Sequence, residues 1–214
     1  MKSGNIQKFI RKLKRPVFTT HELAQASGKS LSTTTQSLRY LERQGLVLKI
    51  YRGIWVDPND PKVSSYAVIP FLRPRHRSYV SFISALHLHH MVEQIPQVIT
   101  LASTSRTRTI STKLGTFCMH QLTPSFFKGF GWYRKTGSFL IAEPEKALVD
   151  SLYLSAYKKK QFGYFPELHF PPGFSFKKAR YWAAIIPSTE AKKYVRKKLQ
   201  LIKTGAHASR KGCE

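Results

Sequence analysis

The chain has 214 residues, of which 36 are Lys or Arg and 11 are Asp or Glu, so its formal net charge at pH 7 is +25. That length suits one large or two small domains, and a hydrophobic fraction of 42% excludes wholesale disorder. The N-terminus lacks the apolar segment of a secretory signal, and no apolar run reaches the ~20 residues that span a bilayer. Because Cys118 and Cys213 make no disulfide framework, we expect a soluble protein of the reducing cytoplasm.

The positive charge is distributed along the whole chain. Residues 1–70 carry a net charge of +8, residues 71–140 carry +8, and residues 141–214 carry +9. A basic tail on a neutral body does not give this distribution. It favours a polyanion as the partner, and nucleic acid is the commonest polyanion. We therefore expect a cytoplasmic protein associated with the nucleoid.

Three helices are predicted before residue 45. Apolar residues between Asn5 and Lys14 recur at i, i+3, i+4 and i+7, which is the spacing of an amphipathic helix. A short second helix is expected to begin near Thr20 and to end at Gly28. Ser30 can cap a third helix, which runs to about Gln44.

The periodicity changes after the third helix. The segments Leu46–Ile50 and Ile54–Val56 are rich in strand formers, and Tyr51–Gly53 can turn between them. A helix, a short helix, a third helix and a β-hairpin occur in this order in a winged helix-turn-helix. The alternative is an unrelated small helical domain with a hairpin, but the caps, the breaks and the change of period all favour the winged helix.

Prolines and Asx residues between Asp57 and Arg77 indicate an exposed connection after the hairpin. We therefore predict an α+β protein with a winged helix-turn-helix in residues 1–60 and a mixed α/β domain in residues 61–203. Residues 204–214 are expected to form a disordered basic tail. In the second domain, Val98–Ala102 and Gly115–Leu122 are predicted strands, and Ser81–Met91 is a predicted helix.

The third predicted helix has a polar start, with no carboxylate before Glu42. A recognition helix reads base edges in the major groove with its N-terminal residues, where Gln pairs with adenine and Arg with guanine. For any single residue a solvated polar face is an equally good explanation, whereas for the group DNA contact is favoured. The residues that we assign to DNA contact are Ser32, Thr33, Thr34, Thr35, Gln36, Arg39 and Tyr40.

Further phosphate contacts are expected outside the third helix. Lys49, Tyr51 and Arg52 lie on or near the predicted hairpin tip, while Trp55 is expected to pack beneath the hairpin. Arginine clusters are stronger candidates than lysines, because the planar guanidinium binds phosphate with two hydrogen bonds. The arginines assigned to DNA contact are Arg75, Arg77, Arg106 and Arg108. Other basic clusters, which can equally be solvated surface, are Arg134–Lys135, Lys158–Lys160 and Lys192–Lys198.

Two downstream segments, Tyr79–His90 and Ile141–Asp150, contain the sequences Ser-Ala-Leu and Glu-Pro-Glu-Lys-Ala-Leu. Together with Leu46–Val56 they resemble the AbiEi-type antitoxin family of type IV toxin–antitoxin systems. The resemblance extends from about Ile6 to Tyr157, although Met91 stands where members often have glycine. It implies a winged-helix repressor that binds inverted repeats in the promoter of its own operon. It also implies a C-terminal domain that neutralises a nucleotidyltransferase-like toxin, without the need for a stable complex.

A second hypothesis is a protein-interaction module whose C-terminal domain inhibits the toxin directly, so that DNA binding is secondary. On the first hypothesis the partners are double-stranded DNA and the cognate toxin. The chain is expected to be a monomer in solution or a dimer on DNA, with no membrane partner.

Four histidines and one cysteine are candidate ligands of a metal ion such as zinc: His87, His89, His90, Cys118 and His120. No carboxylate or second cysteine accompanies them at an established spacing, so packed or solvated histidines are favoured. The chain has no Walker loop, no His-Glu-x-x-His and no Gly-x-Ser-x-Gly. We therefore expect no catalytic, metal or cofactor site and no enzyme activity, and we assign Glu143, Glu145 and Asp150 to helix-start electrostatics and a salt-bridged surface.

Overall fold

The computed structural model describes residues 4–133, 139–157, 162 and 167–211, which form a mixed α+β protein. The chain divides into two compact units, Met1–Arg75 with Ile110–Thr116, and His76–Thr109 with Phe117–Glu214. This division differs from the boundary expected at residues 60–61. Helix α4 (Ser65–Leu72) belongs to the first unit because it follows a short turn rather than a linker and contacts β1 of that unit.

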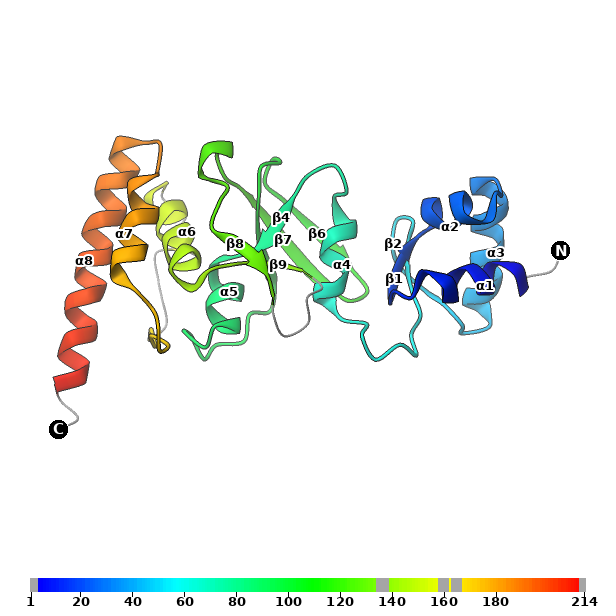
Figure 1. The fold of residues 1–214 in the computed structure, drawn as a ribbon, viewed down its shortest axis with the longest axis horizontal. Helices are drawn as coiled ribbons and strands as arrows, with labels where there is room; N and C mark the ends of the chain where they lie inside the picture. Colours follow the sequence, from blue (N-terminus) through cyan, green and yellow to red (C-terminus); the bar gives the residue numbers. More distant parts are fainter. Residues whose placement is uncertain (1–3, 134–138, 158–161, 163–166, 212–214) are drawn as a thin grey trace. The chain divides into compact units, whose positions relative to one another are not determined.

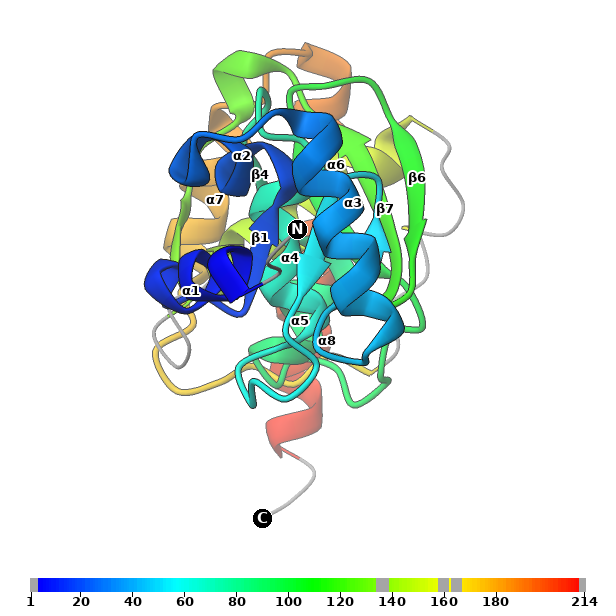
Figure 2. The same ribbon diagram turned by 90° about the vertical axis from the view of Figure 1, so that its right-hand side faces the viewer.

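The first unit contains the three helices and the hairpin that the sequence predicts, with one additional strand, β1, and one additional helix, α4. Its elements are α1 (Gly4–Leu13), β1 (Val17–Thr19), α2 (Thr20–Ser27), α3 (Leu31–Arg43), β2 (Leu48–Tyr51), β3 (Ile54–Val56) and α4. The unexpected strand β1 pairs antiparallel with β3, so the hairpin becomes a three-stranded sheet in the order β1-β3-β2. In Figure 2, α1, α2 and α3 of this unit lie toward the viewer.

Side-chain caps fix the starts of α2 and α3, and a glycine ends α2. The Thr19 hydroxyl accepts from the Glu22 backbone N–H at 3.1 Å, and the Glu22 carboxylate accepts from the Thr19 N–H at 2.8 Å. Burial disfavours the charged form of Glu22, but the bonds from Thr19 and the guanidinium of Arg15 outweigh burial and lower the pKa of Glu22. Gly28 (φ 65°) ends α2, and Ser30 caps α3 by accepting from the Thr33 N–H.

The core of the first unit joins α1, α2 and α3 to the sheet. Its buried members are Ile6, Phe18, Leu23, Leu38, Leu41, Val47 and Trp55. Trp55 is only 1% exposed, and its indole N–H donates to the Thr20 hydroxyl at 2.9 Å. The prediction that Trp55 packs beneath the hairpin is therefore confirmed.

A six-stranded sheet in the order β6-β7-β5-β4-β9-β8 forms the centre of the second unit. The end of its β6–β7 hairpin, Ile110–Thr116, is the segment that belongs to the first unit. Its strands are β4 (Ser78–Val80), β5 (Ile99–Ser103), β6 (Arg108–Thr112), β7 (Gly115–Gln121), β8 (Phe130–Trp132) and β9 (Leu140–Ala142). Parallel pairs (β5 with β7, β4 with β9) and antiparallel pairs (β4 with β5, β8 with β9) are mixed. The strands predicted at β5 and β7 and the helix predicted at α5 (Phe82–Leu88) are confirmed. A short 3-10 helix, Pro124–Phe126, lies between β7 and β8 in the sequence.

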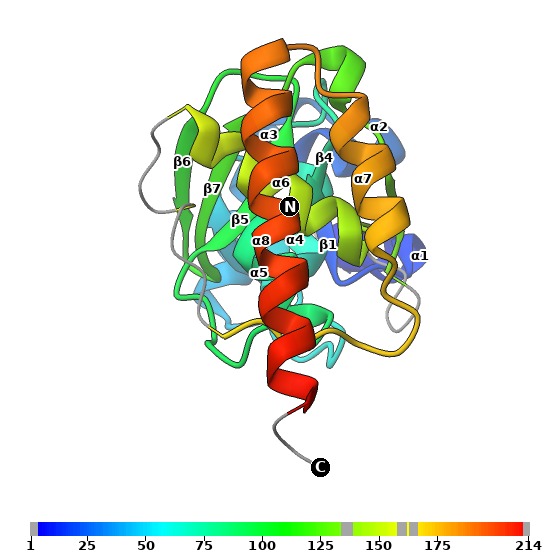
Figure 3. The same cartoon turned by 90° about the vertical axis from the view of Figure 1, so that its left-hand side faces the viewer.

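Helix α6 (Pro144–Ala156) lies between the sheet and the last two helices, α7 (Phe176–Ala184) and α8 (Thr189–Lys211), as Figures 1 and 3 show. Every residue of α6 from Glu145 to Ser155 is buried. Helix α8 continues to Lys211, so most of the segment that was expected to be a disordered tail is helical. Among the helices in the described ranges, none has the length and apolar character needed to cross a lipid bilayer.

A buried polar cluster holds α6 against the sheet. Lys146 and Asp150, one helical turn apart, are both fully buried and form an ion pair. Asp150 also accepts hydrogen bonds from the Tyr79 hydroxyl at 3.0 Å and the Ser81 hydroxyl at 2.7 Å. Burial raises the pKa of Asp150 and lowers the pKa of Lys146, while the opposite charge of each partner acts against this effect.

The acidic residues of this segment are not where the sequence analysis expected them. Asp150 is fully buried, and Glu145 is 3% exposed and accepts from the Ser175 N–H at 2.9 Å. The expected surface position was wrong for these two residues, because α6 is enclosed on all sides. Both are nevertheless ion-paired, Asp150 with Lys146 and Glu145 with Lys178 at 3.8 Å. Only Glu143, which pairs with Lys178 at 3.1 Å, remains partly exposed.

We predict that Lys146→Met lowers the free energy of unfolding by about 3–5 kcal/mol, because it leaves the Asp150 carboxylate buried without its counter-charge. The double variant Lys146→Met/Asp150→Asn removes both charges and keeps an acceptor for Ser81, so it should lose less than Lys146→Met alone. Urea unfolding followed by circular dichroism measures both. A loss in the double variant that equals or exceeds that of Lys146→Met would contradict this account of the cluster.

Candidate nucleic-acid interface

Helix α3 has one side in the core and one side in solvent. Thr34, Leu38 and Leu41 are fully buried, and they recur at intervals of four and three residues. The exposed residues of the helix are Leu31, Ser32, Gln36, Arg39, Tyr40 and Arg43. The structure therefore brings four residues that the sequence assigned to DNA contact, Ser32, Gln36, Arg39 and Tyr40, onto the solvent side of α3.

The threonines at the start of α3 are used within the helix. Thr34 is fully buried, and its hydroxyl donates to the Ser30 carbonyl at 2.9 Å, so its assignment to DNA contact was wrong. Thr35 is half-buried and donates to the Leu31 carbonyl at 2.7 Å. Thr33 is also half-buried, with its hydroxyl 2.9 Å from that of Ser30. Thr33 and Thr35 are therefore less available than the sequence suggested.

The single carboxylate of α3 faces the hairpin. Glu42 accepts from the backbone N–H of Lys49 at 3.0 Å and lies 3.8 Å from the ammonium group of Lys113. Arg39 and Arg43 are therefore the only charged side chains on the exposed side of α3. The N-terminal end of the helix adds the partial positive charge of its dipole near Ser32.

The hairpin presents one exposed cation at its turn. Arg52 is exposed and precedes Gly53, whose φ of 67° the tight turn requires. Tyr51 is half-buried, and Lys49 lies over the Trp55 ring with its ammonium 5.7 Å from the ring centroid. Arg52 is thus the hairpin residue best placed to reach a ligand from the solvent.

Helix α1 carries a cationic surface. A shallow hollow of about 380 Å³ is lined by Gln7, Lys8, Arg11, Lys12 and Lys14. All four cations are exposed, and the apolar side of the same helix packs into the core through Ile6. Lys8 and Arg11 were not assigned to phosphate contact from the sequence, although their spacing of three residues places them on the same side of the helix.

The remaining arginines that the sequence assigned to DNA contact are exposed but belong to different units. Arg75 is in the first unit, and Arg77, Arg106 and Arg108 are in the second. Arg106 and Arg108 lie at the connection from β5 to β6. Two of the basic clusters, Arg134–Lys135 and Lys158–Lys160, lie outside the described residues.

The histidines named in the metal hypothesis have other surroundings. The His89 Nε2–H donates to the Ala142 carbonyl at 2.7 Å, and burial lowers the pKa of this imidazole. The His120 ring packs edge-on against Phe82 and Phe162, with centroid distances of 5.2 and 4.8 Å. Within the described ranges, no three His, Cys, Asp or Glu side chains are placed to hold a metal ion.

No protein-family model matches the chain, and no curated protein matches it. The resemblance to AbiEi-type antitoxins accordingly rests on the segments quoted from the sequence.

The two sides of α3 predict different effects of substitution. Thr34→Val, which keeps the shape and removes the bond to the Ser30 carbonyl, should lower the free energy of unfolding by about 1 kcal/mol. Gln36→Ala, on the exposed side, should change it by less than about 0.5 kcal/mol. Urea unfolding of the two variants measures both effects, and equal losses would contradict the assignment of a buried and an exposed side.

Proposed function

We propose that the first unit is a winged helix-turn-helix that binds double-stranded DNA, with α3 as the recognition helix and the β2–β3 hairpin as the wing. The observation that carries the proposal is the exposed side of α3, which offers Ser32, Gln36 and Arg39 and no carboxylate. The buried side fixes its orientation, since Leu38 and Leu41 are held in the core. Gly28, which ends α2, and the Ser30 cap of α3 set the turn between these two helices.

The side chains on α3 match the donor and acceptor pattern of the major groove. Gln36 can bond to both N6 and N7 of adenine, and Arg39 to O6 and N7 of guanine, whereas Ser32 is less selective. Ser32 and Gln36 lie in the first two turns, the part of a recognition helix that reaches base edges in such domains. Arg43, at the end of the helix, is then placed for a phosphate rather than a base.

Phosphate contacts in this proposal come from the wing and from α1. Arg52 at the hairpin turn reaches the backbone or the minor groove beside the recognition helix. The α1 cations form a second surface of positive charge without an ion pair to any carboxylate in the described part of the chain. Each phosphate neutralised should contribute about −0.9 to the slope of log K against log salt concentration.

The regulatory role that we propose is that of a repressor of its own toxin–antitoxin operon. Two copies on an inverted repeat double the number of base contacts that one α3 can make, which gives useful specificity to a small domain. The second unit is then the part that neutralises the toxin. The alternative, in which toxin inhibition by this unit is primary and DNA binding secondary, is supported by its size, which exceeds what a DNA anchor requires.

We predict that Arg39→Ala reduces the ratio of the protein's affinity for DNA upstream of the gene that encodes it to its affinity for random DNA. The expected loss is about 1–3 kcal/mol of discrimination, because one bidentate contact to guanine is removed. Fluorescence anisotropy with both duplexes at several salt concentrations measures it. Lys62→Ala, which removes an equal charge from an exposed loop of the same unit, is the matched control and should keep the preference. Equal affinity of the unaltered protein for both DNAs would overturn the proposal of sequence-specific recognition.

The same variant separates the two roles of the second unit. If repression protects the cell, Arg39→Ala should fail to protect against the co-expressed toxin when both genes are under the native promoter. If the second unit inhibits the toxin directly, Arg39→Ala expressed from an independent promoter should protect as well as the unaltered protein. Cell survival is the measurement in both arrangements.

A further inference from the structure

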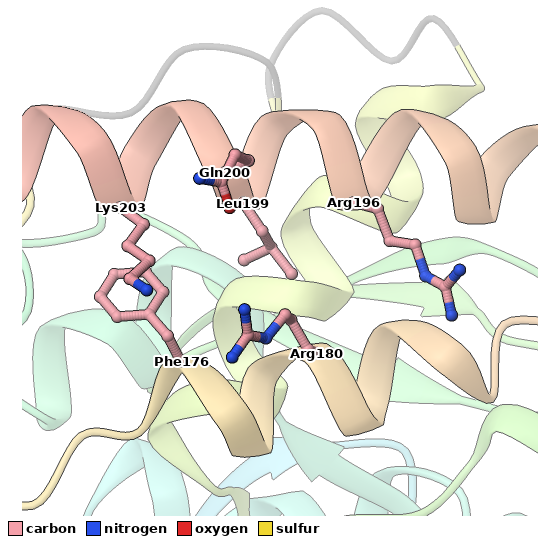
Figure 4. A pocket seen from close by; sticks show the side chains of 6 residues that line it. All are labelled: Phe176, Arg180, Arg196, Leu199, Gln200 and Lys203. Carbon is pink, nitrogen blue, oxygen red and sulfur yellow. The ribbon is translucent and has the colours of Figure 1, made fainter.

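A groove between α7 and α8 has the features of a binding site. It encloses about 250 Å³ and is lined by Phe176 and Arg180 of α7 and by Arg196, Leu199, Gln200 and Lys203 of α8. Figure 4 shows Phe176 and Lys203 toward one end of the groove and Arg196 toward the other, with Arg180 extending from α7 between them. The two helices lie side by side in the second unit, so all six residues belong to one body (Figure 3).

The charge of the groove is not neutralised by the protein. Arg180, Arg196 and Lys203 form no ion pair with any carboxylate in the described ranges, and no acidic residue lines the groove. The nearby Lys178 is different, because it pairs with Glu143 at 3.1 Å. Three cations from two helices line this one groove, where their like charges repel one another unless an anion is present.

The floor of the groove is apolar. Leu199 is 2% exposed, and the Phe176 ring is supported by Phe170 and Phe174, with centroid distances of 5.1 and 5.2 Å. An aromatic ring held by its neighbours can stack on a planar group without losing much side-chain freedom. The hollow on α1 has no comparable apolar floor, since its lining consists of cations and one glutamine. The α7–α8 groove therefore differs from a surface that attracts only phosphate.

We propose that the α7–α8 groove binds a small organic phosphate that carries a planar ring, of the mononucleotide class. The guanidinium groups of Arg180 and Arg196 would bind the phosphates, and Phe176 would stack on the ring. The volume is slightly below the ~300–1,000 Å³ of typical ligand pockets, which suits one nucleotide rather than a larger molecule. This site lies in the second unit and does not depend on DNA binding by α3.

Isothermal titration calorimetry of the full chain with ATP, adenosine and pyrophosphate tests the proposal. ATP should bind about tenfold or more tightly than pyrophosphate, because a stacked base adds to the phosphate contacts. Adenosine alone should bind weakly, because it lacks the anionic group that the three cations attract. ATP and pyrophosphate binding with equal affinity would overturn the proposed ring contact, and no binding of ATP would overturn the site.

Variants locate the binding. Arg180→Gln and Arg196→Gln should each weaken ATP about tenfold. Phe176→Leu should weaken ATP but leave pyrophosphate unchanged. Lys197→Gln removes an exposed charge from α8 outside the groove and should leave both affinities within about twofold. Thermal melting checks that each variant folds. Equal weakening by Lys197→Gln and Arg196→Gln would show general charge attraction and contradict the site.

A titration with duplex DNA distinguishes this site from a second DNA-binding surface. The double variant Arg180→Gln/Arg196→Gln should lose ATP binding and retain the sequence preference of the unaltered protein for DNA. If that variant lost affinity for DNA while the unaltered protein did not bind ATP, the groove would be a phosphate-backbone contact, and the nucleotide proposal would be wrong.

Discussion

The burial of one side of α3 is the constraint on which the proposed interface depends. Leu38 and Leu41 pack with Phe18 and Trp55 in a core that also holds α1 and α2, so α3 cannot rotate without exposing these side chains to water. The side that carries Gln36 and Arg39 is exposed for this reason, and not because polar residues simply avoid the interior. Thr34 is a polar residue on the buried side of the same helix. Its hydroxyl donates a hydrogen bond to the Ser30 carbonyl, so it can be buried without leaving a polar group unpaired.

The use of the acidic residues explains why so much positive charge remains on the surface. Glu22 caps α2, Glu42 binds the backbone of β2, Glu145 binds the start of α7, and Asp150 is enclosed with Lys146. Asp57 and Asp60 accept from backbone N–H groups two residues further along the chain. These carboxylates hold the backbone and interior groups in place. The exposed cations of α1, α3 and α8 are therefore left largely without ion-pair partners among the described carboxylates. The net charge of +25 is accordingly distributed over several separate cationic surfaces.

Local sequence signals were sufficient for α1, α2, α3 and the β2–β3 hairpin, because caps, glycines and apolar periodicity all act within a few residues. They failed where tertiary packing decides. Leu31 is apolar yet 51% exposed, whereas Thr34, which was assigned to DNA contact, is buried. Its spacing of four residues from Leu38 was the signal that could have predicted this burial. Strand β1 is only three residues long and pairs with β3 across the whole unit, and the strand order of the second unit likewise depends on distant pairing. The burial of Lys146 and Asp150 and the convergence of α7 with α8 could not be read from charge patterns, since both depend on which helices surround α6.

The central claim is that the exposed side of α3 contacts DNA bases. The most direct test is an NMR titration of the isotope-labelled full chain with a duplex from upstream of its gene, with a scrambled duplex as the control. The account predicts that the largest amide shift changes that are specific to the upstream duplex occur at Ser32, Gln36 and Arg39, with smaller changes common to both duplexes at Arg52 and along α1. Unchanged resonances of α3 in the presence of saturating upstream DNA would contradict it.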